Sequence, residues 1–448
     1  PRANRTGGGA LVIAPPHYFQ EVRNEAAADW NLLDNNPRIS GPWHTLFSQV
    51  KSPRHVLSEL LQNADDAGAT EASVRLDEGH FVFTHNGEDF SEEHFASLCA
   101  FGRSCKRTMH TIGFRGIGFK STFSLGDTVE LRSPTLSVAF DHERFTEPRW
   151  IDREPSSRAQ TTIRVALKDE RPTSELAKNL DEWLANPLSL LFFRHIRQLT
   201  ICDREIRWES VRPGPSAATE WVSFHHSPGD EYLIARSQPE PLPADALAEV
   251  KKERLLLPDA DEADFPPCTV EIVLGASGQL YVVLPTGVNT QLLFACNAPF
   301  IQSPARLNVR APGDSPTNEW LLKRVGALSA SVMLAWLRDS SASVADRSKA
   351  YTLVPDLARD ETSLEGTCAA IVQKAFWNAV GEQPFLLTDD GQLKSKKQSV
   401  VIPKELFDVW SPAQVTALLD DESRPAFSRH VSAADLLPQC SACPLAAR

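Results

Sequence analysis

Hydrophobic and polar positions recur with two different periods along this chain, and the period distinguishes predicted helices from predicted strands. Apolar residues spaced three to four positions apart predict helices over residues 16–33, 174–185, 245–254 and 319–337. Short apolar runs bounded by turn residues predict strands over residues 81–86, 188–193, 199–201, 270–274, 280–284 and 292–300. Beyond residue 340 the pattern is mostly helical, with a short hairpin near Asp389-Asp390-Gly391. Prolines at 213–268 predict a domain junction with small elements.

One further helix is marked at both ends by its sequence. Ser52 followed by Pro53 is typical of a helix start, and Gly68 is typical of a helix stop. Between these signals the apolar residues form one stripe, namely Val56, Leu57, Leu60, Leu61 and Ala64. The stripe predicts that one side of the helix faces a core.

The opposite face of this helix carries polar side chains at a regular spacing. Glu59, Asn63 and Asp66 stand at i, i+4 and i+7, so they share one face. Two carboxylates and a carboxamide stacked in this way can hold hydrated Mg²⁺ and orient a water molecule. The alternative is a solvated helix face, although asparagine is a poor residue for a helix interior.

A glycine-rich segment follows at residues 112–121. Its order, with Gly113, Gly116 and Gly118, differs from the Gly-x-Gly-x-x-Gly order of dinucleotide-binding folds. A phosphate-binding P-loop is also excluded, because Phe119 stands between Gly118 and Lys120. Both of these nucleotide-binding classes are therefore rejected.

Charge changes the interpretation of that segment. The chain has 46 Lys and Arg against 58 Asp and Glu, a net charge of −12, which gives no global basic footprint for nucleic acid. From residue 94 to 126 there is no acidic residue, and the five cations are Arg103, Lys106, Arg107, Arg115 and Lys120. Glycine amides beside cations suit a polyphosphate, and a flexible solvated loop is the alternative.

Length and composition set wider limits. The 448 residues predict roughly three domains, and 42% hydrophobic with 23% charged residues is typical of a soluble globular protein. The sequence predicts neither a membrane span nor a signal peptide. Cys440 and Cys443 have the spacing of a zinc half-site, but no second pair accompanies them. We expect a reduced, cytoplasmic protein.

Three of these segments, taken in order, resemble the GHKL ATPases. The run ELLQNADDAGAT at 59–70 resembles the magnesium-binding N box, and HNGEDF at 85–90 stands where the superfamily has Asp-x-Gly. The run GFRGIGFKSTF at 113–123 resembles the glycine-rich lid, and residues 160–163 resemble the later Gly-Thr strand with its glycine replaced. The likeness is greatest to the sacsin-like and NO VEIN-like Hsp90-type modules, and it extends over roughly residues 40–340.

The resemblance implies an α/β fold of the Bergerat type, an α+β sandwich in which helices cover a mixed sheet. It implies an N-terminal extension at 1–40, an ATP-binding domain at 41–205 and a second α/β domain at 206–340. A mostly helical region at 341–448 would follow.

The resemblance also implies ATP and Mg²⁺ as cofactors. Glu59 would be the catalytic general base, and Asn63 would ligate Mg²⁺ held by the nucleotide phosphates. The residues implied to bind the nucleotide are Asn63, Asp66, His85, Asn86, Gly87, Lys106, Gly113, Arg115, Gly116, Gly118, Lys120, Thr161 and Arg306.

Two of these assignments carry an open alternative. The family aspartate accepts a hydrogen bond from the adenine amino group, whereas His85 could accept one only in one tautomer, and Asn86 could offer its carbonyl instead. Arg306 would contact the terminal phosphate from the second domain, and a surface arginine in a salt bridge is the alternative.

The implied function is slow ATP hydrolysis that drives a conformational switch, in a chaperone-like or phage-defence role. A nucleotide-sensing module with little turnover is the first alternative, and a MutL- or gyrase-like DNA-processing ATPase is less favoured. A histidine kinase is disfavoured, because it would need a helical phosphoacceptor bundle upstream and fewer than 60 residues precede Glu59. We expect a protein partner or client, and a homodimer is one such assembly. We expect no association with a membrane, and contact with nucleic acid only indirectly, if at all.

Overall fold

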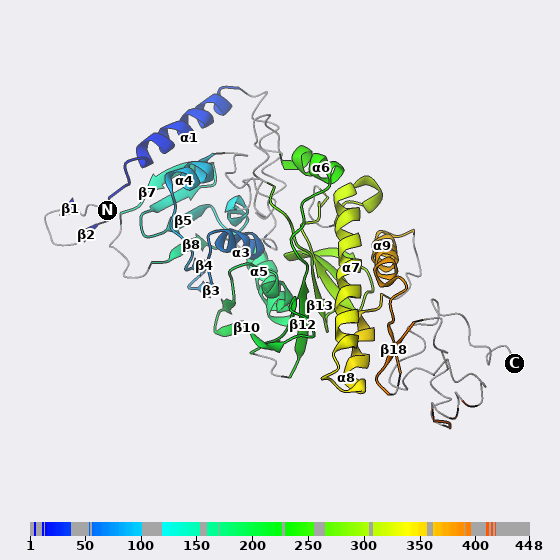
Figure 1. Ribbon diagram of the computed structural model, residues 1–448. Coiled ribbons are helices and arrows are strands. Elements are labelled where there is room, and N and C mark those ends of the chain that lie inside the picture. The colour runs from blue at the N-terminus through cyan, green and yellow to red at the C-terminus, as the bar shows by residue number, and fades with distance from the viewer. Residues whose placement is uncertain are drawn as a thin grey trace. The chain divides into compact units, whose positions relative to one another are not determined.

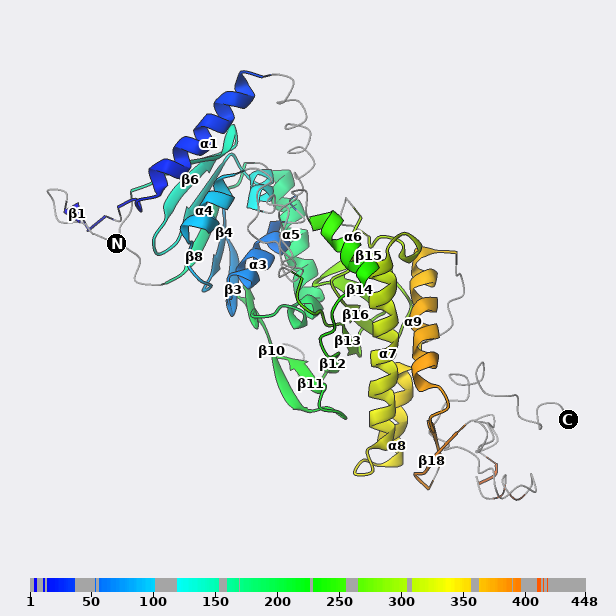
Figure 2. The same ribbon diagram turned by 45° about the horizontal axis from the view of Figure 1, so that its top comes forward.

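The computed structural model describes residues 14–36, 56–100, 119–152, 159–168, 170–225, 229–254, 265–303, 308–355, 362–388 and 390–395, and short pieces at 4–5, 11–12, 53, 409–411, 414 and 417. The chain divides into two compact units (Figures 1 and 2). The first unit comprises Pro1–Trp208, Phe224–His226 and Arg254–Phe265. The second comprises Glu209–Ser223, Ser227–Glu253 and Pro266–Arg448.

A sheet with the strand order β10-β9-β3-β4-β8-β5-β6-β7 forms the centre of the first unit. Its strands are β3 (Glu71–Asp77), β4 (His80–His85), β5 (Thr128–Arg132), β6 (Ser137–Asp141), β7 (Arg144–Trp150), β8 (Thr161–Ala166), β9 (Gln198–Ile201) and β10 (Arg204–Pro213). Neighbours pair antiparallel except β3 with β9, which run parallel, so the sheet is mixed. A separate antiparallel pair joins β1 (Asn4–Arg5) and β2 (Leu11–Val12).

Helices pack against this sheet. They are α1 (Phe19–Asp34), α3 (Val56–Asp66), α4 (Glu92–Cys99) and α5 (Glu170–Ala185), with short 3₁₀ helices η2 (Phe119–Ser124) and η3 (Pro187–Leu191). Helix α1 contacts β7 and α4, and α3 contacts β3 and η2. The indole Nε1 of Trp30 on α1 donates to Oγ1 of Thr146 on β7 at 2.7 Å, which satisfies both buried groups.

The second unit contains a sheet with the order β15-β14-β16-β13-β12-β11. The strands are β11 (Thr219–Phe224), β12 (Glu231–Arg236), β13 (Glu271–Leu274), β14 (Gln279–Val282), β15 (Leu284–Asn289) and β16 (Phe294–Asn297). Its helices are α6 (Ala244–Arg254), η5 (Pro312–Asp314), α7 (Pro316–Arg338), α8 (Val344–Ser348), η6 (Lys349–Leu353) and α9 (Leu364–Val380). A small antiparallel pair joins β17 (Leu386–Leu387) to β18 (Leu393–Lys394).

Helices α7 and α9 lie side by side in both ribbon views. A Cβ on Gly326 would lie 2.3 Å from the carbonyl oxygen of Val372, so glycine permits this close approach. By length and composition alone α7 could cross a membrane, but 72% of its most apolar window is buried in the protein. Such burial is typical of the core helix of a globular unit.

The mixed α/β class predicted from the sequence is confirmed. The Bergerat-type sandwich and the four-part domain division stay predictions. One element was wrong: the apolar run at 188–193 is not a strand, because Pro187–Leu191 form a 3₁₀ helix. Proline stands at the first position of this 3₁₀ helix, where it is favoured. The prediction was wrong because an apolar run alone does not distinguish a strand from a buried helical turn. The proline-rich junction contains two full sheet strands, β11 and β12.

Candidate functional site

The C-terminal end of α3 is closed by backbone hydrogen bonds. Gly68 has φ +73°, its N–H donates to the carbonyl of Asp65 at 2.9 Å, and Ala69 N–H donates to Ala64 at 3.0 Å. This is the Schellman arrangement, in which a left-handed glycine allows the chain to reverse. The predicted helix stop is therefore confirmed.

The two faces of α3 differ in burial as the sequence predicts. Val56, Leu57, Leu60, Leu61 and Ala64 are each no more than 1% exposed, whereas Glu59, Asn63 and Asp66 are half-buried. The stripe faces the core, and the polar face is partly open to solvent. Side chains with this intermediate exposure can meet a ligand and still be held in place by their surroundings.

Asp65 was not singled out by its sequence pattern, and it anchors the site. Its side chain is 3% exposed and accepts three hydrogen bonds from the backbone N–H groups of Arg194, His195 and Ile196, at 3.1, 2.8 and 3.0 Å. A carboxylate bound by several backbone donors is strongly held. Asp65 therefore fastens α3 to the segment that precedes β9, and the adjacent Asp66 is left on the polar face.

The turn after β4 is tied to the end of α3. Oδ1 of Asn86 accepts from the N–H groups of Thr70 and Glu71 at 2.9 and 3.0 Å, and its Nδ2 donates to Thr70 Oγ1 at 2.8 Å. The N–H of Glu88 donates to the carbonyl of Ala67 at 2.8 Å. The carboxamide of Asn86 thus uses its oxygen and its nitrogen to hold the turn, and it is a positioning residue.

His85 stands at the last position of β4 and is 7% exposed. Its Nδ1 accepts a hydrogen bond from the N–H of Gly87 at 3.1 Å. A Cβ at position 87 would lie 3.0 Å from this Nδ1 and 2.8 Å from the carbonyl oxygen of Ala67. Position 87 therefore requires glycine for lack of space, and the imidazole orientation depends on it.

A row of side chains crosses the sheet at His85. Ala72 on β3 and Thr161 on β8 are its direct partners in register, so the three side chains lie on one face. Thr161 is 1% exposed, and its Oγ1 is buried without a hydrogen-bond partner among the residues that the structure describes. A buried hydroxyl of this kind is costly unless a ligand or a water molecule completes it.

Lys120 on η2 is buried, with 3% exposure, and its Nζ donates to the carbonyl of Ala100 at 2.7 Å. Burial lowers the pKa of Lys120 to about 8, and the neighbouring Cys99 partly opposes this. Burial in turn raises the pKa of the Cys99 thiol above its ordinary value. In this structure Lys120 joins η2 to the end of α4, and a cation at a helix C-terminus is favoured by the helix dipole.

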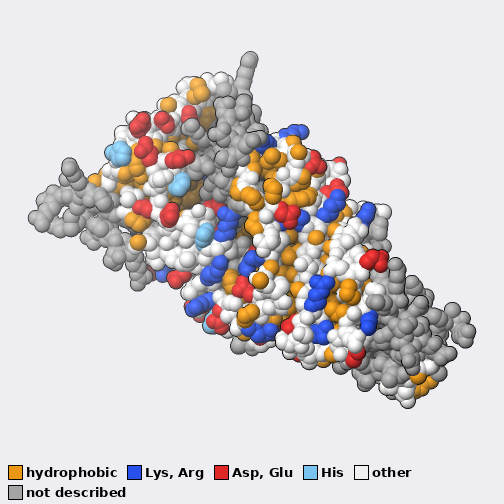
Figure 3. Space-filling view, in the orientation of Figure 1, with side chains coloured by type: hydrophobic (Ala, Val, Ile, Leu, Met, Phe, Trp, Pro, Cys, Tyr) orange, Lys and Arg blue, Asp and Glu red, His pale blue; other side chains and the backbone are white. Residues whose placement is uncertain are grey.

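The surface charge of the first unit is uneven. Figure 3 shows acidic side chains over α1 and α4, and the first turns of these helices hold Glu21, Glu92 and Glu93. Of the acid-free stretch at residues 94–126, the structure describes residues 94–100 and 119–126. Among the five cations of that stretch, only Lys120 lies in this described part.

Several predicted site residues lie outside the described part of the chain. They are Lys106, Gly113, Arg115, Gly116, Gly118 and Arg306, together with Cys440 and Cys443. Within the ranges given above, no group of three His, Cys, Asp or Glu side chains could hold a metal ion. Mg²⁺ held through Asn63 would need most of its oxygen ligands from phosphates and water, as is common for this ion.

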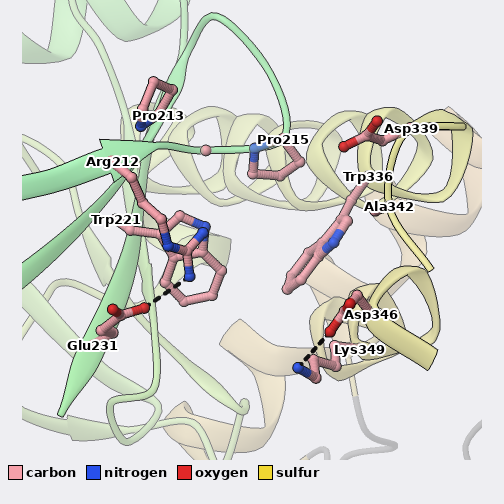
Figure 4. Close-up of a pocket in the computed structure, with 11 residues that line it drawn as sticks. Arg212, Pro213, Pro215, Trp221, Glu231, Trp336, Asp339, Ala342, Asp346 and Lys349 are labelled. Atoms are coloured by element: carbon pink, nitrogen blue, oxygen red, sulfur yellow. Dashed lines mark hydrogen bonds and ion pairs between the residues drawn. The ribbon is translucent and has the colours of Figure 1, made fainter. Parts of the chain in front are cut away.

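A separate cavity of about 510 Å³ lies in the second unit (Figure 4). On one wall the Arg212 guanidinium lies 4.4 Å from the centre of the Trp221 ring and bonds Glu231 at 2.7 Å. On the other wall Lys349 bonds Asp346 at 2.8 Å. Asp339 also lines the cavity, so its walls carry three carboxylates and two cations.

Three curated relatives match about a fifth of this chain. Human sacsin is 28% identical over 116 residues, which are 21% of this chain and 2% of sacsin. Protein NO VEIN of Arabidopsis thaliana is 36% identical over 102 residues, covering 21% of this chain and 4% of that protein. The DNA mismatch repair protein MutL of Herminiimonas arsenicoxydans is 35% identical over 100 residues, which cover 20% of this chain and 16% of that protein.

The chain thus spans between 2% and 16% of the length of these relatives. No protein-family model matches it. The similarity is confined to stretches of 100–116 residues, and it points to a GHKL-like module within this chain.

Proposed function

We propose that the first unit binds a purine nucleoside triphosphate, ATP in the first instance, together with Mg²⁺, and hydrolyses it slowly. The observation that carries the proposal is the row of Ala72, His85 and Thr161. A small side chain, a fixed imidazole and a buried hydroxyl lie together beside the turn that is bound to the end of α3. Similarity to the GHKL-related regions of sacsin, NO VEIN and MutL supports a nucleotide as the ligand.

The polar face of α3 supplies the groups for the phosphate end. Glu59 would orient and deprotonate the attacking water, and Asn63 would contribute one oxygen ligand to Mg²⁺. When bound, Mg²⁺ would neutralise charge on the phosphates, which is its usual contribution to phosphoryl transfer. Asp66 and Thr161 would position the base end, and the amides of 113–118 with Lys106 and Arg115 would cover the phosphates.

In its cellular role we propose a cytoplasmic, ATP-driven conformational switch of the sacsin-like, Hsp90-related type. Arg306 would couple the second unit to the terminal phosphate, and the client would be a protein, in a chaperone-like or phage-defence setting. A homodimer is the simplest assembly for such a switch. The second candidate is a nucleotide sensor with little turnover, which His85 at the position of the family aspartate favours.

The test compares the full chain with Glu59→Gln. Nucleotide binding is measured by calorimetry with Mg²⁺ present, and turnover is measured as phosphate release. Slow turnover by the parent chain, with binding kept and turnover lost in Glu59→Gln, supports the switch. Binding without phosphate release by the parent chain favours the sensor. If no nucleotide binds either protein, the proposed function is wrong. Asp181→Asn, on the exposed surface of α5, is the matched control and should leave both measurements unchanged.

A further inference from the structure

The cavity in the second unit has a buried aromatic centre and an exposed charged edge. Trp336 on α7 is 7% exposed, whereas the side chains of Arg212 and Lys349 are 51% and 64% exposed. An aromatic core inside a polar rim is the usual anatomy of a surface that binds another protein. The volume of about 510 Å³ also lies within the range of about 300–1,000 Å³ typical of ligand pockets. The cavity therefore has room for a side chain of a partner.

The aromatic centre offers ring faces to a cation. The rings of Trp221 and Trp336 lie 5.8 Å apart between their centres, at an angle of 82°. The Arg212 guanidinium lies 4.4 Å from the centre of the Trp221 ring, so this ring already holds one guanidinium. Figure 4 shows the Trp336 ring extending from α7 between the two walls. Tryptophan binds cations more strongly than the other aromatic rings, and a planar guanidinium can stack on it.

The charged edge contains one carboxylate without an ion pair. Glu231 and Asp346 each bond a cation of their own wall, whereas Asp339 forms no ion pair with any residue that the structure describes. Its Oδ1 accepts from the N–H and the hydroxyl of Ser341, and these bonds lower the pKa of Asp339, so the carboxylate is charged at neutral pH. The guanidinium of the nearby Arg347 bonds two backbone carbonyls. Oδ2 of Asp339 is thus left for a cationic ligand.

The loop after β10 has no backbone donor to offer an anion. Pro213 and Pro215 have no N–H, and the N–H of Gly214 donates to the carbonyl of Thr219 at 3.0 Å. The N–H of Ser216 donates to Oγ1 of Thr219 at 2.9 Å. Anion sites usually depend on backbone N–H groups that point at the ligand. With the two lining cations each paired to a carboxylate, the cavity favours a cation over an anion.

We propose that this cavity binds an arginine side chain presented by a peptide segment of a partner protein. The guanidinium would stack on the indole of Trp336 and donate a hydrogen bond to Oδ2 of Asp339. Arginine suits the cavity better than lysine because its planar group can stack and donate at the same time. The site lies within the second unit, so the inference does not depend on nucleotide binding.

The experiment uses three blocked peptides, acetyl-Gly-Ser-Xaa-Ser-Gly-amide, in which Xaa is arginine, citrulline or glutamate. Citrulline has nearly the shape of arginine without its charge. Dissociation constants for the full chain are measured by saturation-transfer NMR at low salt and without nucleotide. We expect the arginine peptide to bind at least tenfold more tightly than the citrulline peptide, and the glutamate peptide to bind most weakly. Equal binding of the arginine and citrulline peptides, tightest binding of the glutamate peptide, or binding of none of them overturns the proposal.

Asp339→Asn tests the position of the ligand. The amide oxygen can still accept from Ser341, but the charge is removed, so the preference for arginine over citrulline should fall severalfold. This preference is a ratio within one protein and does not depend on the fraction that is folded. Asp181→Asn, on the exposed surface of the first unit, is the control and should keep the parent ratio. If Asp339→Asn also keeps the parent ratio, the arginine does not bind in this cavity and the proposal is wrong.

Discussion

The backbone N–H of Gly87 donates to Nδ1 of His85 at 3.1 Å, and the space that a side chain at position 87 would need is occupied by this ring and by the carbonyl of Ala67. The glycine of the HNG phrase is thus required by close packing. The turn geometry, the orientation of the ring and the end of α3 are linked through this one residue.

Gly87→Ala should therefore disturb the site and the fold together. The added methyl would lie 2.8 Å from the oxygen of Ala67, and overpacking of this kind costs about 1–3 kcal/mol of unfolding free energy. Nucleotide affinity should fall with it. Gly313→Ala is the control, since nothing lies within 4 Å of its added Cβ, and it should leave both properties unchanged. Denaturant unfolding and nucleotide titration measure the two effects.

Thr161→Val should separate stability from binding. The hydroxyl has no partner in the described part of the chain, so its removal should leave the unfolding free energy equal or higher, while nucleotide affinity falls about tenfold. Thr146→Val is the opposite case, because it would deprive the buried indole of Trp30 of its acceptor and cost about 1–3 kcal/mol. Lower stability with unchanged affinity in Thr161→Val would show that the hydroxyl has a structural role only.

Asp65→Asn should destabilise the first unit. The amide has a single oxygen for the three backbone donors at 194–196, and its NH₂ group would face a donor. Because hydrogen bonds to charged groups are worth about 1.5–3 kcal/mol each, a loss of at least 2 kcal/mol is expected in denaturant unfolding. Asp181→Asn should change the unfolding free energy by less than about 0.5 kcal/mol, since its side chain is 75% exposed. Equal unfolding curves for the two variants would contradict the anchor.

Lys120 should make stability depend on pH. Unfolded lysine keeps its proton up to about pH 10.5, whereas folded Lys120 loses its proton near pH 8, so the unfolded state binds more protons between these values and stability rises with pH. Relative to Lys120→Met, the parent chain should gain roughly 1 kcal/mol between pH 7 and 9. Above pH 9 the buried Cys99 acts in the opposite direction, because its thiol stays protonated in the folded state.

The control for this measurement is Lys323→Met, whose parent side chain is 57% exposed on α7. Its stability should follow that of the parent chain across the same pH range. If Lys120→Met also follows the parent chain, the lowered pKa of Lys120 is wrong.

Local signals in the sequence predicted the elements around the site well. Gly68 predicted the end of the helix observed as Val56–Asp66, and the apolar stripe predicted its buried face. The start predicted from Ser52 and Pro53 falls among residues 51–55, of which the structure describes residue 53 alone. The predicted hairpin near Gly391 is confirmed by β17 and β18. Such features depend on neighbouring residues, whose chemistry is visible along the chain.

Tertiary contacts could not be predicted in the same way. The role of Asp65 depends on backbone donors about 130 positions later, and its local pattern does not indicate these partners. The carboxamide of Asn86 was considered for the base, but Thr70 and Glu71 occupy it. The role of Lys120 at the phosphates stays a prediction, and its hydrogen bond to a carbonyl twenty positions earlier is a contact that the sequence did not indicate.

The tether between Lys120 and Ala100 has a further consequence for α4 and η2. It holds the end of α4 and the start of η2, twenty positions apart in the sequence, within one direct hydrogen bond of each other. Bringing two distant positions of a chain together has an entropic cost, and here that cost is met within the folded unit. A ligand that contacts both α4 and η2 would therefore meet two ends that are already joined.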